Sequence, residues 1–281
     1  MSLHPRLFPT LLVFLLFCAC APAGGGLESL PAEGDLKALE LARSIYQRNR
    51  DLPTLALRGE VNYSRGTERW YFRFELVGRR PDAFLFTILD PMGTPAYRIL
   101  ADGSRIKALD YRQRIYYQGA GGERPLEAFL PLPLSSSEFL SLLAGILPEE
   151  PVSARGESGL SPEDRAGYLS YRSGDPNDPG PWFLRLTGGP GFRPEDKPVL
   201  TELSRGSRRD PEFSARYDKW GKHPREDIGE LVDFPEELQA VWNGRSRILV
   251  KAVYTEIRLG FTAPESVFRL ERPEGFSARE L

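Results

Sequence analysis

The segment TLALRGEVNYSRGTERWYFRFEL, residues 54–76, constrains the fold most, because apolar and polar residues alternate along it almost without interruption. A period of two is typical of strands that turn one face to a core and the other to water. A turn at Arg65-Gly66 divides the segment and predicts an antiparallel hairpin. The apolar face of this hairpin comprises Leu55, Leu57, Gly59, Val61, Tyr63, Trp70, Phe72, Phe74 and Leu76.

Four more short strands are predicted after the hairpin. DAFLFTILD, residues 82–90, is apolar on both faces, which indicates that something covers its outer side as well. AYRILA, RIKALD and RIYYQG follow, with tight turns at Asp102-Gly103 and Tyr111-Arg112. Six consecutive antiparallel strands form a meander, and we expect a meander of this length to curl because strands twist.

Two helices are expected beside this sheet. The first begins after Asp35 as N-cap and carries Leu36, Leu39 and Ala42 on one apolar stripe. In LSSSEFLSLLAGILP, Ser135 and Glu138 fit a capping box, and few of the following positions are polar. A helix this apolar cannot lie on the outside in water, so we expect it to lie against the open side of the curled sheet.

Residues 151–230 are less regular and rich in Pro, Gly and charged residues, with strands expected only at YLSYRS, WFLRLT and VLTELS. Regular patterns return with FPEELQAVW, a turn at Asn243-Gly244, and the alternating segment SRILVKAVYTEIRLG. We find no repeat and no sign of a second compact domain. The fold class predicted is therefore mainly β, with residues 35–281 forming one domain that contains a loop-rich segment at 151–230.

The N-terminal run from Leu7 to Cys20 is apolar but shorter than the roughly 20 residues that a membrane-spanning helix needs, and it predicts a signal peptide over residues 1–19. Phe17-Cys18-Ala19-Cys20 resembles the lipobox of bacterial lipoproteins, so Cys20 is the predicted lipidation site, carrying a diacylglycerol and an N-acyl chain such as palmitate. Residues 20–34 are then a lipidated N-terminus and flexible linker. The alternative is an ordinary signal peptide whose cysteines have no such role.

Candidates for catalysis are scarce. Beyond Cys18 and Cys20 the chain has no thiol, and its two histidines are His4, in the signal peptide, and His223, in a charged stretch interpreted as a surface loop. We interpret the carboxylate pairs Glu149-Glu150 and Glu236-Glu237 as solvated ends of elements. The sequence therefore predicts a protein that is not an enzyme, with no catalytic residue.

Cofactor and nucleic-acid sites are not predicted either. TGGPGF lacks the Lys-Ser/Thr of a phosphate loop, and DPNDPG lacks the glutamate that closes a calcium loop. The 37 Lys and Arg residues nearly balance the 39 Asp and Glu residues, which gives no basic surface for nucleic acid. We therefore expect no metal and no cofactor.

Abundant aromatic and aliphatic side chains point to one side of the predicted sheet. Most of them are expected to be ordinary core, but a curved sheet with one helix laid across it can also enclose an apolar cavity for acyl chains. The predicted cavity-lining residues are Leu57, Val61, Trp70, Phe72, Phe74, Phe84, Phe86, Ile88, Phe139 and Leu143.

The stretch LFTILDPMGTPAYRILADGSRIKALDYRQRIYY resembles the LolB-like outer-membrane lipoprotein family, relatives of the periplasmic carrier LolA. The matching elements are the helix at 35–49, the strand pair at 55–76, Asp90-Pro91-Met92-Gly93 after the next strand, and the turn Ala101-Asp102-Gly103. The resemblance implies an incomplete antiparallel β-barrel, or half-barrel, with helices closing an apolar cavity. It also implies a chaperone-like transport function, accepting acylated proteins and placing them in the outer membrane without a cofactor.

One residue acquires a role from this resemblance. LolB-like receptors expose an apolar residue in the loop after the third strand, where it engages the membrane, and Met92 occupies that position between Pro91 and Gly93. The alternative is that Met92 folds back into the core. These three residues are the predicted membrane-engaging loop.

The functional hypothesis is a lipid-anchored, periplasm-facing protein that binds acyl chains of lipoproteins or lipids and serves their localisation to the outer membrane, with a LolA-type carrier as a possible partner. Ala21 follows the predicted anchor where Asp would favour retention in the inner membrane. The alternative is a structural lipoprotein subunit of a cell-envelope complex, without lipid transfer. An envelope hydrolase would need a nucleophile and a base close together, and the sequence shows no such pair.

Overall fold

The computed structural model describes residues 33–48, 51–120, 125–129, 132, 134–148, 150–156, 166–173, 181–187, 199–206, 210–244 and 246–281. The predicted signal peptide, Cys20 and most of the linker therefore lie outside the described residues. None of the described helices is long and apolar enough to cross a membrane.

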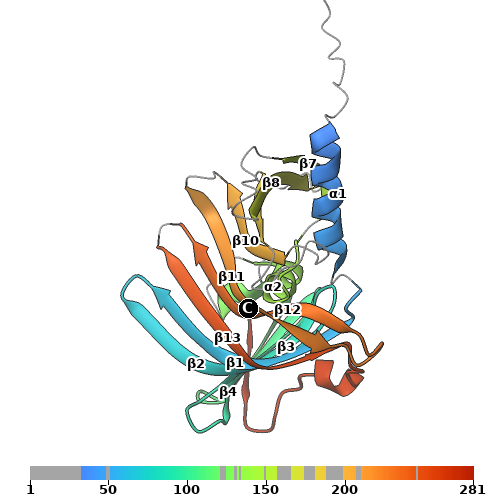
Figure 1. Cartoon of the computed structure of the whole chain (residues 1–281). Coiled ribbons are helices and arrows are strands. Elements are labelled where there is room, and N and C mark those ends of the chain that lie inside the picture. The colour runs from blue at the N-terminus through green and yellow to red at the C-terminus, as the bar shows by residue number, and fades with distance from the viewer. Residues whose placement is uncertain are drawn as a thin grey trace, which may run out of the picture. The chain divides into compact units, whose positions relative to one another are not determined.

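One large open sheet dominates the described part of the chain (Figure 1). Its order is β14-β6-β5-β4-β3-β2-β1-β13-β12-β11-β10-β9-β8-β7, and each neighbouring pair is antiparallel except β14 and β6, which are parallel. The edge strands β14 and β7 do not pair with each other, so the barrel is incomplete, as predicted. The strands are β1 (Thr54–Arg65), β2 (Glu68–Arg79), β3 (Ala83–Leu89), β4 (Pro95–Asp102), β5 (Arg105–Asp110), β6 (Ile115–Ala120), β7 (Pro151–Gly156), β8 (Ala166–Ser173), β9 (Trp182–Thr187), β10 (Val199–Gly206), β11 (Pro211–Pro224), β12 (Leu231–Trp242), β13 (Ile248–Leu259) and β14 (Ser277–Glu280).

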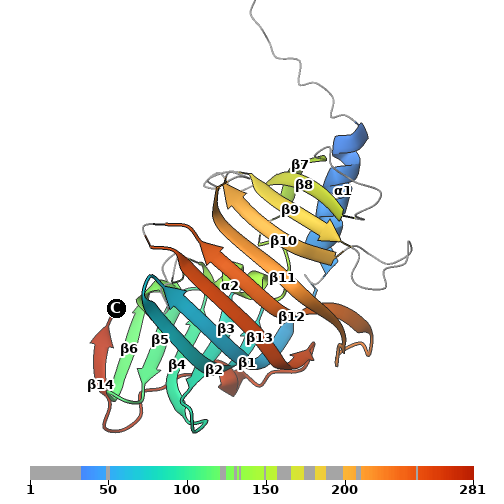
Figure 2. The ribbon, with the colours of Figure 1, turned by 60° about the vertical axis from the view of Figure 1, so that its left-hand side comes forward.

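The predicted six-strand meander is confirmed as β1–β6, which follow one another in the sheet (Figure 2). The alternation in the opening hairpin produces its observed register, in which Val61 pairs with Phe72 and Tyr63 with Trp70. The pairing of β1 with β13 joins this meander to the later strands, and Val61 lies opposite Ala252 there. Apolar residues from segments far apart in the sequence thereby line one face of the sheet.

Helix α1 (Glu33–Arg48) packs beside β7, the edge strand at the far end of the sheet from β14 (Figure 1). The Arg43 side chain donates a hydrogen bond to the carbonyl of Pro151 in β7, with 3.4 Å between Nε and O. The predicted start at Asp35 is wrong, because the helix already begins at Glu33. Few hydrogen bonds define the end of a helix, so its exact first residue is the least predictable part of it.

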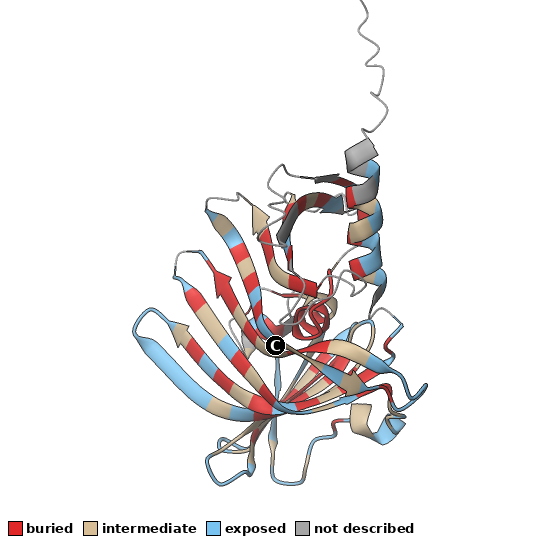
Figure 3. Cartoon of the chain, in the orientation of Figure 1, coloured by how far each residue is buried: buried red, intermediate tan, exposed pale blue. Residues whose placement is uncertain are grey.

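Helix α2 (Ser136–Leu143) lies against the concave face of the sheet, and most of its side chains are buried (Figure 3). The predicted capping box is confirmed. The Ser135 hydroxyl accepts a hydrogen bond from the Glu138 backbone N–H at 3.1 Å, and the Glu138 carboxylate accepts one from the Ser135 backbone N–H at 2.8 Å. A short 3₁₀ helix, η1 (Pro125–Ala128), precedes it, and a second, η2 (Glu265–Phe268), follows β13.

The outer face of the meander is covered by the segment 260–281, which confirms the prediction made from the two-sided apolar strand β3. Leu270 is buried against Leu100, Leu109 and Tyr116 in a cluster separate from the main core. The segment ends in β14, which adds to the sheet beside β6. This segment is thus the cover that the pattern of β3 required.

The segment 151–230 is more regular than predicted. YLSYRS, WFLRLT and VLTELS are confirmed as β8, β9 and β10, but β7 and the 14-residue strand β11 lie where the sequence predicts loops. His223 therefore lies in β11 rather than in a surface loop, opposite Val232 of β12. The charged residues of β11 sit on its exposed positions, while Phe213, Ala215 and Tyr217 are buried, so alternation is present but is broken by register shifts after Tyr217.

Candidate functional site

A small apolar cavity of about 50 Å³ lies between α2 and the concave face of the sheet. Strands β1, β2, β3, β12 and β13 form its floor and α2 forms its roof. Its walls are built by Val61, Tyr63, Phe72, Phe74, Phe86, Leu132, Phe139, Leu142, Leu143, Leu238, Ala240, Trp242, Val250 and Ala252. The lining is hydrocarbon and aromatic, which suits an apolar ligand.

Six of the ten predicted lining residues border the cavity, namely Val61, Phe72, Phe74, Phe86, Phe139 and Leu143. The other four lie elsewhere. Leu57 and Phe84 are fully buried in the surrounding core, and Ile88 packs against that core. Trp70 is 48% exposed and stacks on Tyr63, with 5.3 Å between ring centroids, because it sits near the tip of the hairpin.

The cavity wall formed by β12 and β13 was not predicted from the sequence. Leu238, Ala240 and Trp242 alternate along β12, and Val250 and Ala252 alternate along β13. The period of two was visible in both segments. What it did not show is that β13 pairs with β1, which brings this wall next to the first hairpin.

The cavity is closed down by the side chains of α2. At about 50 Å³ it is far below the roughly 300–1,000 Å³ of ordinary ligand pockets. Phe139 of α2 reaches down to the sheet, where its ring centroid lies 5.1 Å from that of Phe84 and 5.9 Å from that of Phe86. An acyl chain therefore requires α2 to move away from the sheet.

Two buried tyrosines hold the C-terminal end of α2. The Tyr217 hydroxyl donates to the carbonyl of Leu142 at 2.9 Å, and the Tyr254 hydroxyl donates to the carbonyl of Leu143 at 3.1 Å. These carbonyls belong to the last turn of the helix, which lacks the regular helical donors four residues further on. Burial raises the pKa of Tyr217 and of Tyr254 above the ordinary tyrosine value, so both hydroxyls stay protonated as donors.

A glycine ends α2 next to these two tyrosines. Gly145 has φ +64°, in the left-handed region, and a Cβ atom there would lie 2.7 Å from the ring of Trp220. Its backbone N–H donates to the carbonyl of Leu142 at 3.3 Å, which ends the helix.

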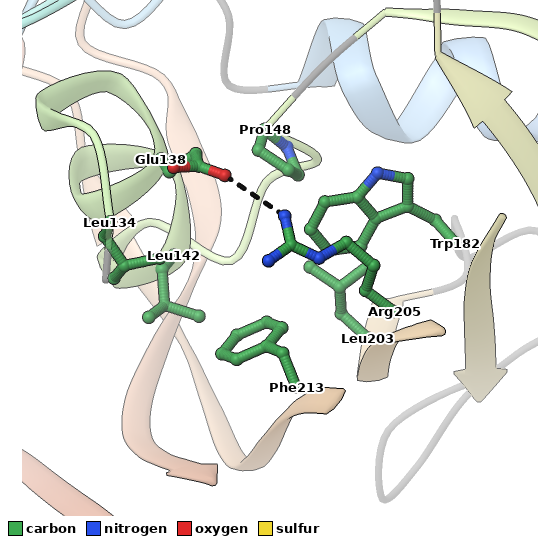
Figure 4. Close-up of a pocket in the computed structure, with 8 residues that line it drawn as sticks. All are labelled: Leu134, Glu138, Leu142, Pro148, Trp182, Leu203, Arg205 and Phe213. Atoms are coloured by element: carbon green, nitrogen blue, oxygen red, sulfur yellow. Dashed lines mark ion pairs between the residues drawn. The ribbon is translucent and has the colours of Figure 1, made fainter. Parts of the chain in front are cut away.

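The N-terminal end of α2 faces a second, smaller pocket (Figure 4). Its volume is about 10 Å³, and an ion pair crosses it, with 3.6 Å between Nη1 of Arg205 and Oε1 of Glu138. The Arg205 guanidinium carbon lies 5.3 Å from the ring centre of Trp182, a cation–π distance. The remaining wall residues are Leu134, Leu142, Pro148, Leu203 and Phe213.

The predicted membrane-engaging loop projects from the sheet between β3 and β4. Met92 is 88% exposed, so its side chain lies in solvent and not in the core. The Asp90 carboxylate accepts hydrogen bonds from the backbone N–H groups of Met92 and Thr94, each at 2.9 Å, and Gly93 adopts φ +86°. Arg73 on β2 donates to the carbonyl of Pro91 at 2.8 Å. The turn is thus fixed with its apolar tip outward.

Titratable groups elsewhere form ion pairs on the sheet surface. Glu236 contacts Lys219 at 2.7 Å and His223 at 3.3 Å, so it is paired within β12 and is not a solvated end as interpreted from the sequence. The hydrogen bond from Lys219 lowers the pKa of Glu236. Among the described residues, no three His, Cys, Asp or Glu side chains gather into a group that could hold a metal ion.

Several solved structures have the same fold at low sequence identity. A LolA superfamily protein from Nitrosomonas europaea is 12% identical, with a TM-score of 0.52, over 85% of this chain and 99% of that chain. A domain from Vibrio parahaemolyticus named for outer membrane lipoprotein sorting is 10% identical, with a TM-score of 0.57, over 83% and 96% of the two chains. A DUF1329 family protein from Desulfovibrio piger is 8% identical, with a TM-score of 0.57, over 85% and 98%.

No protein-family model matches the chain, and no curated protein matches it. The structural matches nevertheless agree with the resemblance found in the sequence, and the chain has a fold of the LolA/LolB type.

Proposed function

From this LolA-type fold we propose that the protein binds acyl chains of lipoproteins or lipids beneath α2 and serves their localisation to the outer membrane. It does so without catalysis, anchored through Cys20 and facing the periplasm, with a LolA-type carrier as its donor. The observation that carries the proposal is the apolar cavity between α2 and the sheet. A helix laid over aliphatic and aromatic walls offers a hydrocarbon chain the same environment as a membrane interior.

The membrane step is assigned to Met92. A fixed turn holds this flexible apolar side chain in solvent, where it has no contact with the core to stabilise it. Inserting such a tip between lipid head groups would bury it and bring the cavity to the membrane surface.

The second candidate is a structural lipoprotein subunit of an envelope complex that transfers no lipid. The small cavity volume, about 50 Å³, favours this candidate because it leaves no room for a chain without movement of α2. The two candidates differ in whether acyl compounds bind at all.

Binding is tested with the full-length chain carrying Cys20→Ser, by native mass spectrometry for co-purifying lipid and by titration with the neutral fluorophore 1-N-phenylnaphthylamine. We expect saturable binding, weakened by Ala252→Leu because Ala252 lines the cavity. Ala56→Leu adds the same atoms on the other face of β1 and should leave binding intact. The absence of bound lipid and of a saturable signal in the unsubstituted cavity would favour the structural subunit.

The role of Met92 is tested by Met92→Glu, because a charge at the tip is costly only if the tip meets hydrocarbon. We expect reduced recovery with sedimented liposomes and impaired transfer, with an unchanged unfolding midpoint. Ile228→Glu is the matched control, since Ile228 is also an exposed apolar residue, 52% exposed, but lies in the turn at the opposite end of the strands. Equal liposome binding by the Met92 variant and the parent would remove Met92 from the membrane step.

A further inference from the structure

Arg205 is a charged residue on the inner, apolar face of the sheet. In the pairing of β10 with β9, Arg205 lies opposite Trp182. Its side chain is on the same face of the sheet as that of Leu203. Its side chain is only 17% exposed. Burying a guanidinium is costly unless its N–H donors have acceptors, so the hydrogen-bond partners of Arg205 need to be identified.

Those donors are poorly satisfied. A guanidinium carries five N–H groups, yet the contact of Nη1 with Glu138 is 3.6 Å, longer than a hydrogen bond. Nε of Arg205 is buried without a hydrogen-bond partner among the described residues, and so is Nε1 of Trp182 in the same pocket wall. Buried donors left without acceptors are rare, and they point to a group that completes them.

The charge of Arg205, in contrast, is already balanced. Glu138 accepts a hydrogen bond from Ser135 N–H through Oε2 and faces Arg205 with Oε1, as Figure 4 shows for the ion pair. A second carboxylate or a phosphate would bring an uncompensated negative charge among Leu, Pro, Phe and Trp side chains. A neutral oxygen acceptor would satisfy the free donors without that cost.

The space beside Arg205 suits a single oxygen. About 10 Å³ is room for one water-sized group. The pocket also adjoins the larger cavity, because Leu142 lines both, and the ring of Phe213 in the pocket wall lies 5.0 Å from that of Trp242 in the cavity wall. A ligand with its chain in the cavity can therefore place its polar end at Arg205.

We infer that Arg205 binds the carbonyl oxygen at the head of a neutral acyl ester or amide whose hydrocarbon chain occupies the cavity beneath α2. The inference rests on the proposed acyl-chain binding and adds to it the chemical class of the ligand. Esters and amides share the acceptor oxygen, whereas free fatty acids add a charge and alkyl ethers lack the carbonyl.

The test compares two ligands that differ only in that carbonyl. The full-length chain carrying Cys20→Ser is loaded with 1-N-phenylnaphthylamine, which is displaced by 1-palmitoylglycerol, an ester, or by 1-O-hexadecylglycerol, the corresponding ether. We expect the ester to bind about tenfold more tightly, as one hydrogen bond to a charged donor allows. Hexadecanoate should bind more weakly than the ester, and N-hexadecanoylglycinamide should behave like the ester.

Variants then assign the preference to Arg205. Arg205→Lys keeps the charge opposite Glu138 but removes the Nε donor and the planar fork, and should reduce the ester preference to within about twofold. Arg216→Lys makes the same exchange at an exposed arginine paired with Asp218 and should retain the full preference. Near-ultraviolet circular dichroism checks that both variants keep the parent fold.

The outcomes separate this inference from the function on which it rests. Equal binding of ester and ether by the parent protein overturns the ester site and leaves acyl-chain binding standing, and this comparison needs no variant. An ester preference that survives Arg205→Lys overturns the role of Arg205. If neither glyceride displaces the probe, the proposed acyl-chain binding fails as well.

Discussion

The two ends of α2 are attached to the protein in different ways. At the N-terminal end, Ser135 and Glu138 cap the helix, and Glu138 forms a largely buried ion pair with Arg205. At the C-terminal end, buried hydroxyls of Tyr217 and Tyr254 bind the last carbonyls. The N-terminal end is held mostly by contacts within the helix itself, and the C-terminal end by side chains of β11 and β13.

This difference indicates how the cavity can open. The contact between Glu138 and Arg205 is 3.6 Å, longer than a hydrogen bond, and water can hydrate both charges once this end of the helix lifts. Withdrawing the Tyr254 hydroxyl leaves the Leu143 carbonyl without a donor among the described residues, at about 1–3 kcal/mol, and withdrawing the Tyr217 hydroxyl removes one of the two donors of the Leu142 carbonyl. We therefore expect α2 to swing open from its N-terminal end for ligand entry, with the tyrosine end as the pivot, and to bring Glu138 back to Arg205 when it closes over the bound chain.

The largest effect is expected from breaking the pivot with Tyr217→Phe and Tyr254→Phe together. The free energy of unfolding should fall by about 2 kcal/mol, because the Leu143 carbonyl loses its donor and the Leu142 carbonyl keeps only the N–H of Gly145, while ring packing is kept. Urea unfolding followed by tryptophan fluorescence measures the change. Tyr71→Phe removes a hydroxyl from a residue that is 60% exposed and should change stability little. If the double variant were as stable as the parent protein, the tyrosines would not hold the C-terminal end of α2 more firmly than the N-terminal end is held.

The pivot should also weaken at alkaline pH. Because burial raises the pKa of both tyrosines, the unfolded chain releases these protons first, from about pH 10. Their contribution to stability is therefore complete below about pH 10 and decreases above it, by up to about 1.4 kcal/mol per pH unit for each tyrosine. Urea unfolding between about pH 9 and about pH 11 should show a shallower decline for the double phenylalanine variant. Identical pH dependences of the parent and the double variant would show that the two buried tyrosines do not cause the decline.

The smallest effect is expected at the other end. Ser135→Ala removes the capping hydroxyl and should lower the free energy of unfolding by about 1 kcal/mol. Because it loosens the end that swings, it should also speed the uptake of 1-N-phenylnaphthylamine in stopped-flow mixing. Ser135→Asp keeps a capping oxygen and should restore both values. Faster uptake from the tyrosine variants than from Ser135→Ala would reverse the assignment of pivot and moving end.

The same contrast separates what the sequence predicted from what it did not. The capping box spans four residues, so the segment SSSE, residues 135–138, is enough to predict it. Tyr217 lies 75 residues after Leu142, and Tyr254 lies 111 residues after Leu143, so their pairing exists only once the sheet is assembled. Local patterns carry no information about such partners.

The sheet follows the same rule. The meander β1–β6 was predictable because its turns are short and its alternation is clean. Strand β11 was missed because register shifts interrupt its period and because Trp220, His223 and Pro224 do not resemble a regular strand. The cavity lining was predicted from the first three strands and α2, while the wall from β12 and β13 depended on the pairing of β1 with β13.

The cover formed by residues 260–281 has a consequence for biogenesis. Leu100, Leu109 and Tyr116 are synthesised long before Leu270, the residue that shields them. While the ribosome is still adding the intervening strands, the nascent meander exposes an apolar outer surface, which general chaperones would have to shield until residues 260–281 have been synthesised.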